Sequence, residues 1–218
     1  QRQMCIRDRS KDTRDMTFEV LTPAQIAAGH KADHILDTVK ARPIDWNNIE
    51  DPKDKEVWDK LTENFWLPEK VPLSNDVKSY NNLPEAEKKV MQNTYGMLTL
   101  LDTIQSTVGA TAMVGDALTP HEEAVYSNIV FMESVHAKSY SSIFSTLCSK
   151  EENDAIFEWT ENNELVQNLA RIQMNFYTDI DPIKRKIAGT MLEGYLFYTG
   201  FFTPFYTVSY THLTLPTI

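Results

Sequence analysis

Glycine is scarce in this 218-residue chain, which contains only seven, and none forms a Gly-x-Gly-x-x-Gly or P-loop pattern. The sequence therefore gives no sign of the glycine-rich loops that bind nucleotide phosphates in α/β folds. Cysteine is scarcer still. Cys5 and Cys148 are far apart and form no Cys-x-x-Cys pair, so neither a disulfide framework nor a zinc ribbon is indicated. We expect a protein of the reducing cytoplasm.

The sequence also has few basic residues and no long apolar run. The 21 basic residues are outnumbered by 31 acidic ones, which gives a net charge of -10. This balance argues against a nucleic-acid partner. The most apolar stretch, residues 195–206, is shorter than the roughly 20 residues of a membrane-spanning helix and contains Pro204. The charged start of the chain resembles no secretory signal, so we expect no membrane partner.

Helical periodicity dominates the rest of the sequence. Thr119-Pro-His-Glu122 has the pattern of a capping box with proline at the first helical position, and Asp181-Pro182 repeats the cap-plus-proline start. No segment shows a convincing strand period, so the pattern predicts an all-α bundle. We expect helices over residues 53–63, 84–115, 120–148, 152–161, 164–177 and 182–204.

One expected helix carries a carboxylate, an imidazole and a phenol on a single face. Glu133, His136 and Tyr140 are spaced i, i+3 and i+7, which brings their side chains together on a helix. The same face is apolar along its length, and a buried carboxylate is costly unless a partner such as a metal cation neutralises it. Glu-x-x-His alone is a weak signal, because a core histidine bonded to a glutamate gives the same pattern. Two further acids in apolar helical stripes, Asp102 and Glu193, favour a metal site.

Dimetal sites in helical bundles combine two lone carboxylates with two Glu-x-x-His pairs from other helices. This chain has both lone acids but one pair, and a second pair should follow Glu193 by some tens of residues. The sequence stops at Ile218 before that point. We interpret His212, which lies among threonines, as an exposed side chain and not as the missing metal ligand. We interpret His30 and His34 as part of a polar helix face.

Several segments resemble the small, radical-bearing beta subunit of class Ib ribonucleotide reductase, over residues 45–206. They are Asn-Phe-Trp-Leu-Pro-Glu-Lys-Val-Pro-Leu-Ser-Asn at 64–75, Leu-Thr-Leu-Leu-Asp-Thr at 98–103 and Ala-Leu-Thr-Pro-His-Glu-Glu-Ala at 117–124. The most specific is Phe-Met-Glu-Ser-Val-His-Ala-Lys-Ser-Tyr-Ser-Ser-Ile-Phe-Ser-Thr-Leu-Cys at 131–148.

The resemblance implies a ferritin-like fold and a homodimer that works with a large subunit to reduce ribonucleoside diphosphates in the bacterial cytoplasm. It implies a dinuclear manganese or iron centre and a tyrosyl radical, and for manganese a flavodoxin-like activating protein. The matching positions imply that Tyr140 carries the radical and that Trp66 begins the radical path to the large subunit. The implied metal ligands are Asp102, Glu133, His136 and Glu193.

The expected domain organisation follows from where the resemblance begins and ends. Residues 1–15 are interpreted as a non-native leader, 16–43 as an unmatched extension and 207–218 as a non-native tail. Residues 44–206 form a partial ferritin-like domain that lacks its last core helices, so we expect the fragment to be inactive alone. Two alternatives stay open: another ferritin-like dimetal oxidase or oxygenase, and a non-catalytic helical interaction module.

Overall fold

The computed structural model describes residues 43–207, and the contacts between residues place all of its described helices in a unit that begins at Trp46. The leader, the extension up to residue 42 and the tail from residue 208 on lie outside the described residues, and with them Cys5, His30, His34 and His212. The described elements, in chain order, are α2 (Pro52–Glu63), η2 (Pro68–Lys70), η3 (Leu73–Asn75), α3 (Val77–Asn81), α4 (Glu85–Ile104), η4 (Gln105–Gly109), α5 (Ala110–Val114), α6 (Pro120–Leu147), α7 (Lys150–Asn162), α8 (Glu164–Tyr177), α9 (Pro182–Met191), η5 (Leu192–Leu196) and α10 (Phe197–Thr207).

Capping side chains start α6 and α9 where the sequence indicated, whereas α7 begins two residues before the expected position 152, with Ser149 as its cap. Asp181 accepts a hydrogen bond from the backbone N–H of Ile183 at the start of α9. At the start of α6, Thr119 Oγ1 accepts from the Glu122 N–H at 2.8 Å, as expected. The reciprocal bond of the expected capping box differs, because the Glu122 carboxylate accepts from the N–H of Leu118 rather than of Thr119.

Two of the expected helices contain a π-helical turn that the sequence did not reveal. The helical run that begins with α4 passes through the π-helical η4 into α5 and ends at Val114. The run that begins with α9 passes in the same way through the π-helical η5 into α10, which continues to Thr207. A π-helical turn inserts an extra residue into a helix and is frequent at functional sites.

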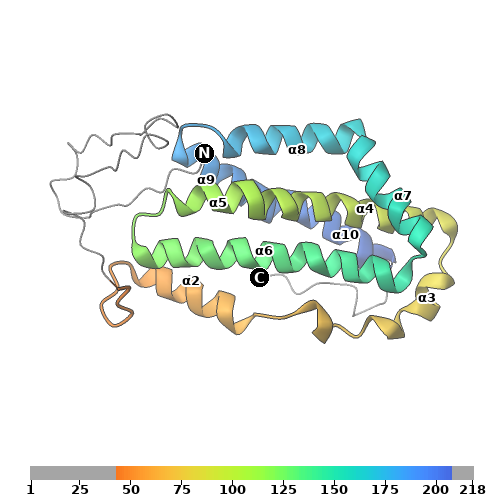
Figure 1. Cartoon of the computed structure of the whole chain (residues 1–218), viewed down its shortest axis with the longest axis horizontal. Helices are drawn as coiled ribbons and strands as arrows, with labels where there is room; N and C mark the ends of the chain where they lie inside the picture. Colours follow the sequence, from red (N-terminus) through yellow and green to blue (C-terminus); the bar gives the residue numbers. More distant parts are fainter. Residues whose placement is uncertain (1–42, 208–218) are drawn as a thin grey trace, which may run out of the picture. The chain divides into compact units, whose positions relative to one another are not determined.

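The long helices pack side by side around one apolar core (Figure 1). The run α4–α5 lies along α6, α10 packs against α4, and α9 packs against α5. Helices α7 and α8 cover α4, while α2 lies along α6. The core between them includes the fully buried side chains of Leu98, Leu101, Phe144, Ile156 and Leu192. No strand occurs between residues 43 and 207, so the predicted all-α bundle is confirmed.

Candidate metal centre

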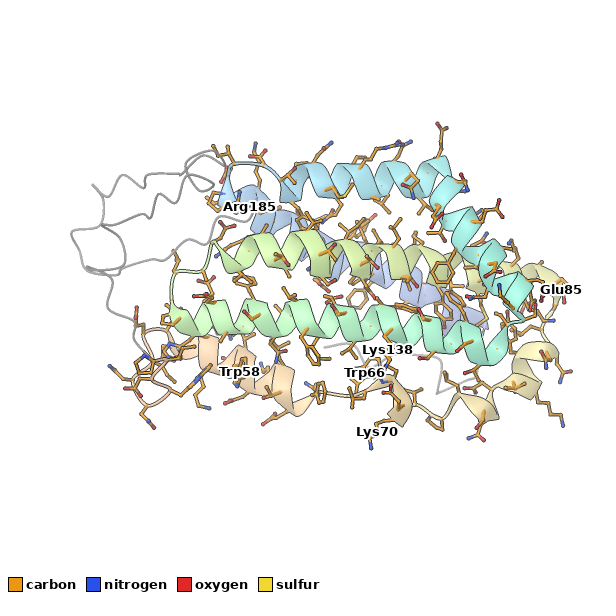
Figure 2. The ribbon with its side chains drawn as sticks, in the orientation of Figure 1. Trp58, Trp66, Lys70, Glu85, Lys138 and Arg185 are labelled. Atoms are coloured by element: carbon orange, nitrogen blue, oxygen red, sulfur yellow. The ribbon has the colours of Figure 1, made fainter. Side chains whose placement is uncertain are left out.

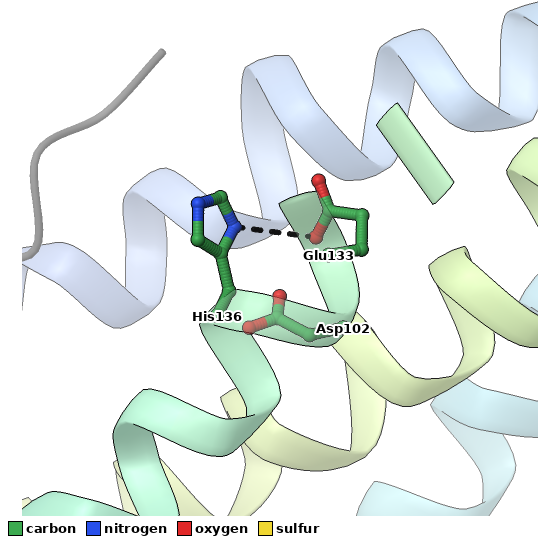
Figure 3. A group of neighbouring side chains, drawn as sticks. All are labelled: Asp102, Glu133 and His136. Carbon is green, nitrogen blue, oxygen red and sulfur yellow. Dashed lines mark ion pairs between the residues drawn. The ribbon is translucent and has the colours of Figure 1, made fainter. Parts of the chain in front are cut away.

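Three of the residues singled out from the sequence converge between α4 and α6. Asp102 lies near the end of α4, while Glu133 and His136 lie one turn apart on α6 (Figure 3). Each offers a ligand atom, and these three atoms all lie within 4.8 Å of one another. Side chains spaced i and i+3 share a helix face, and the packing of α4 on α6 supplies the third ligand.

The cluster is buried and short of hydrogen-bond partners. Asp102 and Glu133 are each 2% exposed. Among the described residues, no hydrogen-bond partner reaches Asp102 Oδ2, Glu133 Oε2 or His136 Nε2. The nearest approach within the cluster is 3.5 Å, between His136 Nδ1 and Glu133 Oε2. Buried carboxylate oxygens without partners are costly, and two carboxylates with one imidazole form a donor set that suits manganese, iron or zinc. These residues therefore fit a divalent metal ion.

Electrostatic repulsion within the cluster opposes its full ionisation. Burial raises the pKa of Asp102 well above its usual range, and the neighbouring carboxylates of Glu133 and Glu193 raise it further. This environment favours the protonated form of the carboxyl group, and a bound cation would favour the ionised form. The cluster can therefore exchange a proton for a metal ion.

Glu193 faces the same cavity from the π-helical turn η5, but it lies outside the compact group of three. The protein atoms around it, followed by the Glu133 carboxylate, raise the pKa of Glu193 to about 8. Solvent reaches this side chain from the cavity, which moderates the repulsion. One oxygen, Oε1, accepts a hydrogen bond from Gln105 Nε2 at 2.8 Å.

A cavity of about 710 Å³ connects these groups with the phenol of Tyr140. Tyr140 is 2% exposed and lies one helical turn after His136 on α6. Burial raises its pKa well above the usual range, and the negative charge of Asp102 acts in the same direction. Its ring centroid lies 5.6 Å from that of Tyr95, and its phenol belongs to the same buried core cluster as Phe144 and Phe197. The phenol is thus shielded from bulk water.

Trp66 contacts the cluster from the segment between α2 and η2. Its indole ring stacks on the imidazole of His136, with the centroids 5.5 Å apart. Figure 2 shows Trp66 beside α6, close to Lys138. Lys138 forms an ion pair with Glu69 of η2, and both side chains are largely exposed.

Gln105 is a buried polar residue of this region that the sequence interpretation missed. It lies in η4, is 2% exposed, and joins Glu193 to Tyr177 through its side-chain amide. The available signal was its position three residues after Asp102, which puts both side chains on one helix face. The π-helical turn could not be inferred from the residue pattern.

A buried carboxylate–histidine cluster inside an all-α bundle defines the class of ferritin-like dimetal carboxylate proteins. The sequence model of the family described as "Ribonucleotide reductase, small chain" matches residues 43–214. The chain belongs to this family, which confirms the resemblance and the ferritin-like fold.

Curated relatives and a solved structure support this membership. The chain is 58% identical over 180 residues to the ribonucleoside-diphosphate reductase subunit beta of Mycobacterium leprae, which covers 83% of this chain and 55% of that protein. It is 54% identical over 171 residues to the ribonucleoside-diphosphate reductase 2 subunit beta of Escherichia coli K12. This match covers 78% of this chain and 54% of that protein. The dimanganese(II)-NrdF structure of Streptococcus sanguinis superposes with a TM-score of 0.75 at 52% identity, covering 77% of this chain and 59% of that one.

The chain spans little more than half the length of the curated relatives that it matches. Over the residues that the structure describes, no helix combines the length and hydropathy needed to cross a membrane.

Proposed function

We propose that this chain contributes the metal-binding, radical-generating part of a class Ib ribonucleoside-diphosphate reductase small subunit. The observation that carries the proposal is the buried cluster of Asp102, Glu133 and His136, whose ligand atoms lie within 4.8 Å of one another. Tyr140 borders the same cavity, and Trp66 stacks on His136. A carboxylate–imidazole cluster, an oxidisable phenol and an indole in contact with it are the parts that this chemistry requires.

The proposed metal ligands are Asp102, Glu133, His136 and Glu193, which would hold manganese or iron in a dinuclear centre. The Streptococcus sanguinis relative is described as a dimanganese protein, which favours manganese. When bound, such a centre supplies the oxidising power, drawn from activated oxygen, that removes one electron from a phenol.

The residues around Tyr140 would control the fate of its radical. Loss of one electron from the ring and of the hydroxyl proton, both taken up at the bound centre, would leave a neutral phenoxyl. A phenoxyl persists when water and reductants are kept away. Tyr140, Ile143 and Phe197 are each less than 5% exposed, so apolar packing encloses the ring.

Trp66 and His136 would pass the oxidising equivalent from the cluster towards the large subunit, where a ribonucleoside diphosphate is reduced. The proposed partners are that large subunit, a second copy of this chain, and a flavodoxin-like protein that activates the manganese form. The proposed compartment is the bacterial cytoplasm.

Manganese titration of the 218-residue chain tests the proposal, with the electron paramagnetic resonance signal of free Mn²⁺ as the readout. We expect weak binding, because one Glu-x-x-His pair supplies only part of the ligand set of a bundle-core dimetal site. Glu133→Gln should weaken that binding by about 10-fold or more, since it removes a charged ligand. Glu158→Gln, an exposed acid on α7, is the matched control and should leave the affinity unchanged.

Two results would overturn the proposed metal site. One is the absence of bound manganese and iron after loading, which would favour a helical interaction module. The other is equal manganese affinity in Glu133→Gln and Glu158→Gln, which would place the metal elsewhere.

A further inference from the structure

Gln105 links the side chains of Tyr177 and Glu193 through the two ends of its side-chain amide. Its Nε2 donates to Glu193 Oε1 at 2.8 Å, and its Oε1 accepts from the hydroxyl of Tyr177 at 2.5 Å. Gln105 is 2% exposed and Tyr177 is 1% exposed. Three elements thus meet in one chain of hydrogen bonds: α8 provides Tyr177, η4 provides Gln105 and η5 provides Glu193.

The Tyr177 hydroxyl determines which way the amide faces. An amide presents a donor at one end and an acceptor at the other. When a metal ion is bound, the Glu193 carboxylate is ionised and can only accept, so the NH₂ group must face it and the oxygen then faces Tyr177, as observed. The hydroxyl donates to that oxygen and so stabilises this orientation over the reverse one.

We propose that Gln105 and Tyr177 form a positioning pair that holds the Glu193 carboxylate in place for a metal ion. The inference rests on the proposed function, in which Glu193 is a ligand. The hydrogen bond from Gln105 occupies Oε1 of Glu193, so the other carboxylate oxygen is the one that would coordinate. Gln105 is also neutral, so it orients a carboxylate without adding a cation that would repel the metal ion.

Gly109 leaves the space that this pair occupies. It lies one turn after Gln105 at the end of η4. A Cβ atom at position 109 would lie 2.5 Å from Gln105 Oε1 and 2.6 Å from two ring atoms of Tyr177. Both distances are far below van der Waals contact, so any larger residue there would push the pair apart. The site therefore depends on a glycine that touches no proposed ligand.

The structure contains a second buried glutamine–tyrosine pair that serves as a control. Gln92 Nε2 donates to the hydroxyl of Tyr80 at 2.8 Å, and both residues border a separate small cavity near Cys148. Gln105→Met and Gln92→Met each remove one amide while keeping side-chain length. Tyr177→Phe and Tyr80→Phe each remove one hydroxyl.

Manganese titration of the metal-free chain and its variants supplies the first readout. We expect Gln105→Met and Tyr177→Phe to lower the affinity by about 10- to 100-fold, the usual effect of losing a partner that orients a ligand. The variants Gln92→Met and Tyr80→Phe should stay within about threefold of the parent chain. Gly109→Ala should reproduce the loss, whereas Gly115→Ala, where a Cβ makes an ordinary contact, should not.

Crystal structures of the metal-free variants supply the second readout, which is independent of metal. Glu193 should leave its present orientation in Gln105→Met, and should keep it in Gln92→Met. If Gln105→Met does not fold, Tyr177→Phe decides, because it retains the buried ring. An unmoved Glu193 in the folded Gln105 or Tyr177 variant would overturn the inference, as would unchanged manganese affinity. Failure of the parent chain to bind manganese would instead contradict the proposed function. In that case the crystal structures would still show whether Gln105 and Tyr177 hold Glu193 in its orientation.

Discussion

The indole ring of Trp66 lies almost parallel to the imidazole ring of His136, with an interplanar angle of 17° and centroids 5.5 Å apart. The two residues come from segments 70 positions apart and meet where the chain between α2 and η2 runs along α6. The stack links a proposed metal ligand to a residue that is partly exposed. It therefore provides a direct contact between the buried cluster and the protein surface.

Replacing Trp66 with phenylalanine tests this contact as a radical path. In a full-length small subunit that carries this sequence, we expect Trp66→Phe to keep the tyrosyl radical and to reduce ribonucleotide reduction to background, because a phenyl ring is far harder to oxidise than an indole. Trp58→Phe is the control, since Trp58 packs on Trp46 instead. Radical spectroscopy and deoxynucleotide formation with the large subunit are the measurements. Undiminished nucleotide reduction with an intact radical would favour a different ferritin-like oxidase.

Tyr140→Phe should abolish the tyrosyl radical and leave metal binding in place. The substitution removes one hydroxyl from a ring that stays packed in the core, so we expect little change in the fold. Electron paramagnetic resonance of the loaded full-length subunit gives the radical content, and metal analysis of the same sample gives the occupancy. A radical signal that survives the substitution would contradict the assignment of Tyr140.

The metal-free chain should lose stability as the pH rises above about 4, the ordinary pKa of a carboxyl group. The pKa of Asp102 is raised in the folded state, so between its unfolded and folded pKa values the folded chain binds a proton that the unfolded chain has released. Each such group lowers the free energy of unfolding by about 1.4 kcal/mol per pH unit in that range. Glu193 should add a smaller effect of the same sign up to about pH 8, because solvent reaches it.

Urea unfolding of the metal-free chain at pH 5 to 8 measures this dependence. In Asp102→Asn the dependence should become flatter, because the substituted group does not titrate. Manganese binding should show the opposite trend and strengthen with pH, since the ion displaces protons. A parent chain as stable at pH 8 as at pH 5 would show that the cluster does not take up a proton on folding.

Leu98→Ala should destabilise the bundle by about 2–5 kcal/mol, through the lost burial and the cavity that remains. Leu98 is 1% exposed in the core of α4. Leu165, on α8, is 80% exposed, and Leu165→Ala should change the stability by less than about 0.5 kcal/mol. Chemical denaturation of both variants checks the difference. Similar losses in the two would mean that this core does not hold the bundle together.

The sequence by itself determined the helices and most of the candidate site. Helix starts are encoded locally, because a capping side chain such as Asp181 bonds to an N–H only two residues away. The spacing of Glu133, His136 and Tyr140 is local in the same sense, since a helix fixes the angle between neighbouring positions. The family resemblance then implied that Trp66 begins the radical path. This role, like the domain boundaries, stays a prediction.

Only the tertiary structure decided how groups on different helices meet. The packing of α4 on α6 brings Asp102 to the Glu133 and His136 pair, while it leaves Glu193 outside the compact group. The π-helical turns, and with them the chain from Tyr177 through Gln105 to Glu193, could not be predicted from periodicity. A π-helical turn is stabilised by packing against neighbouring helices, and that packing depends on residues distant in sequence. In η4, for example, Gly109 lies close to the ring of Tyr177.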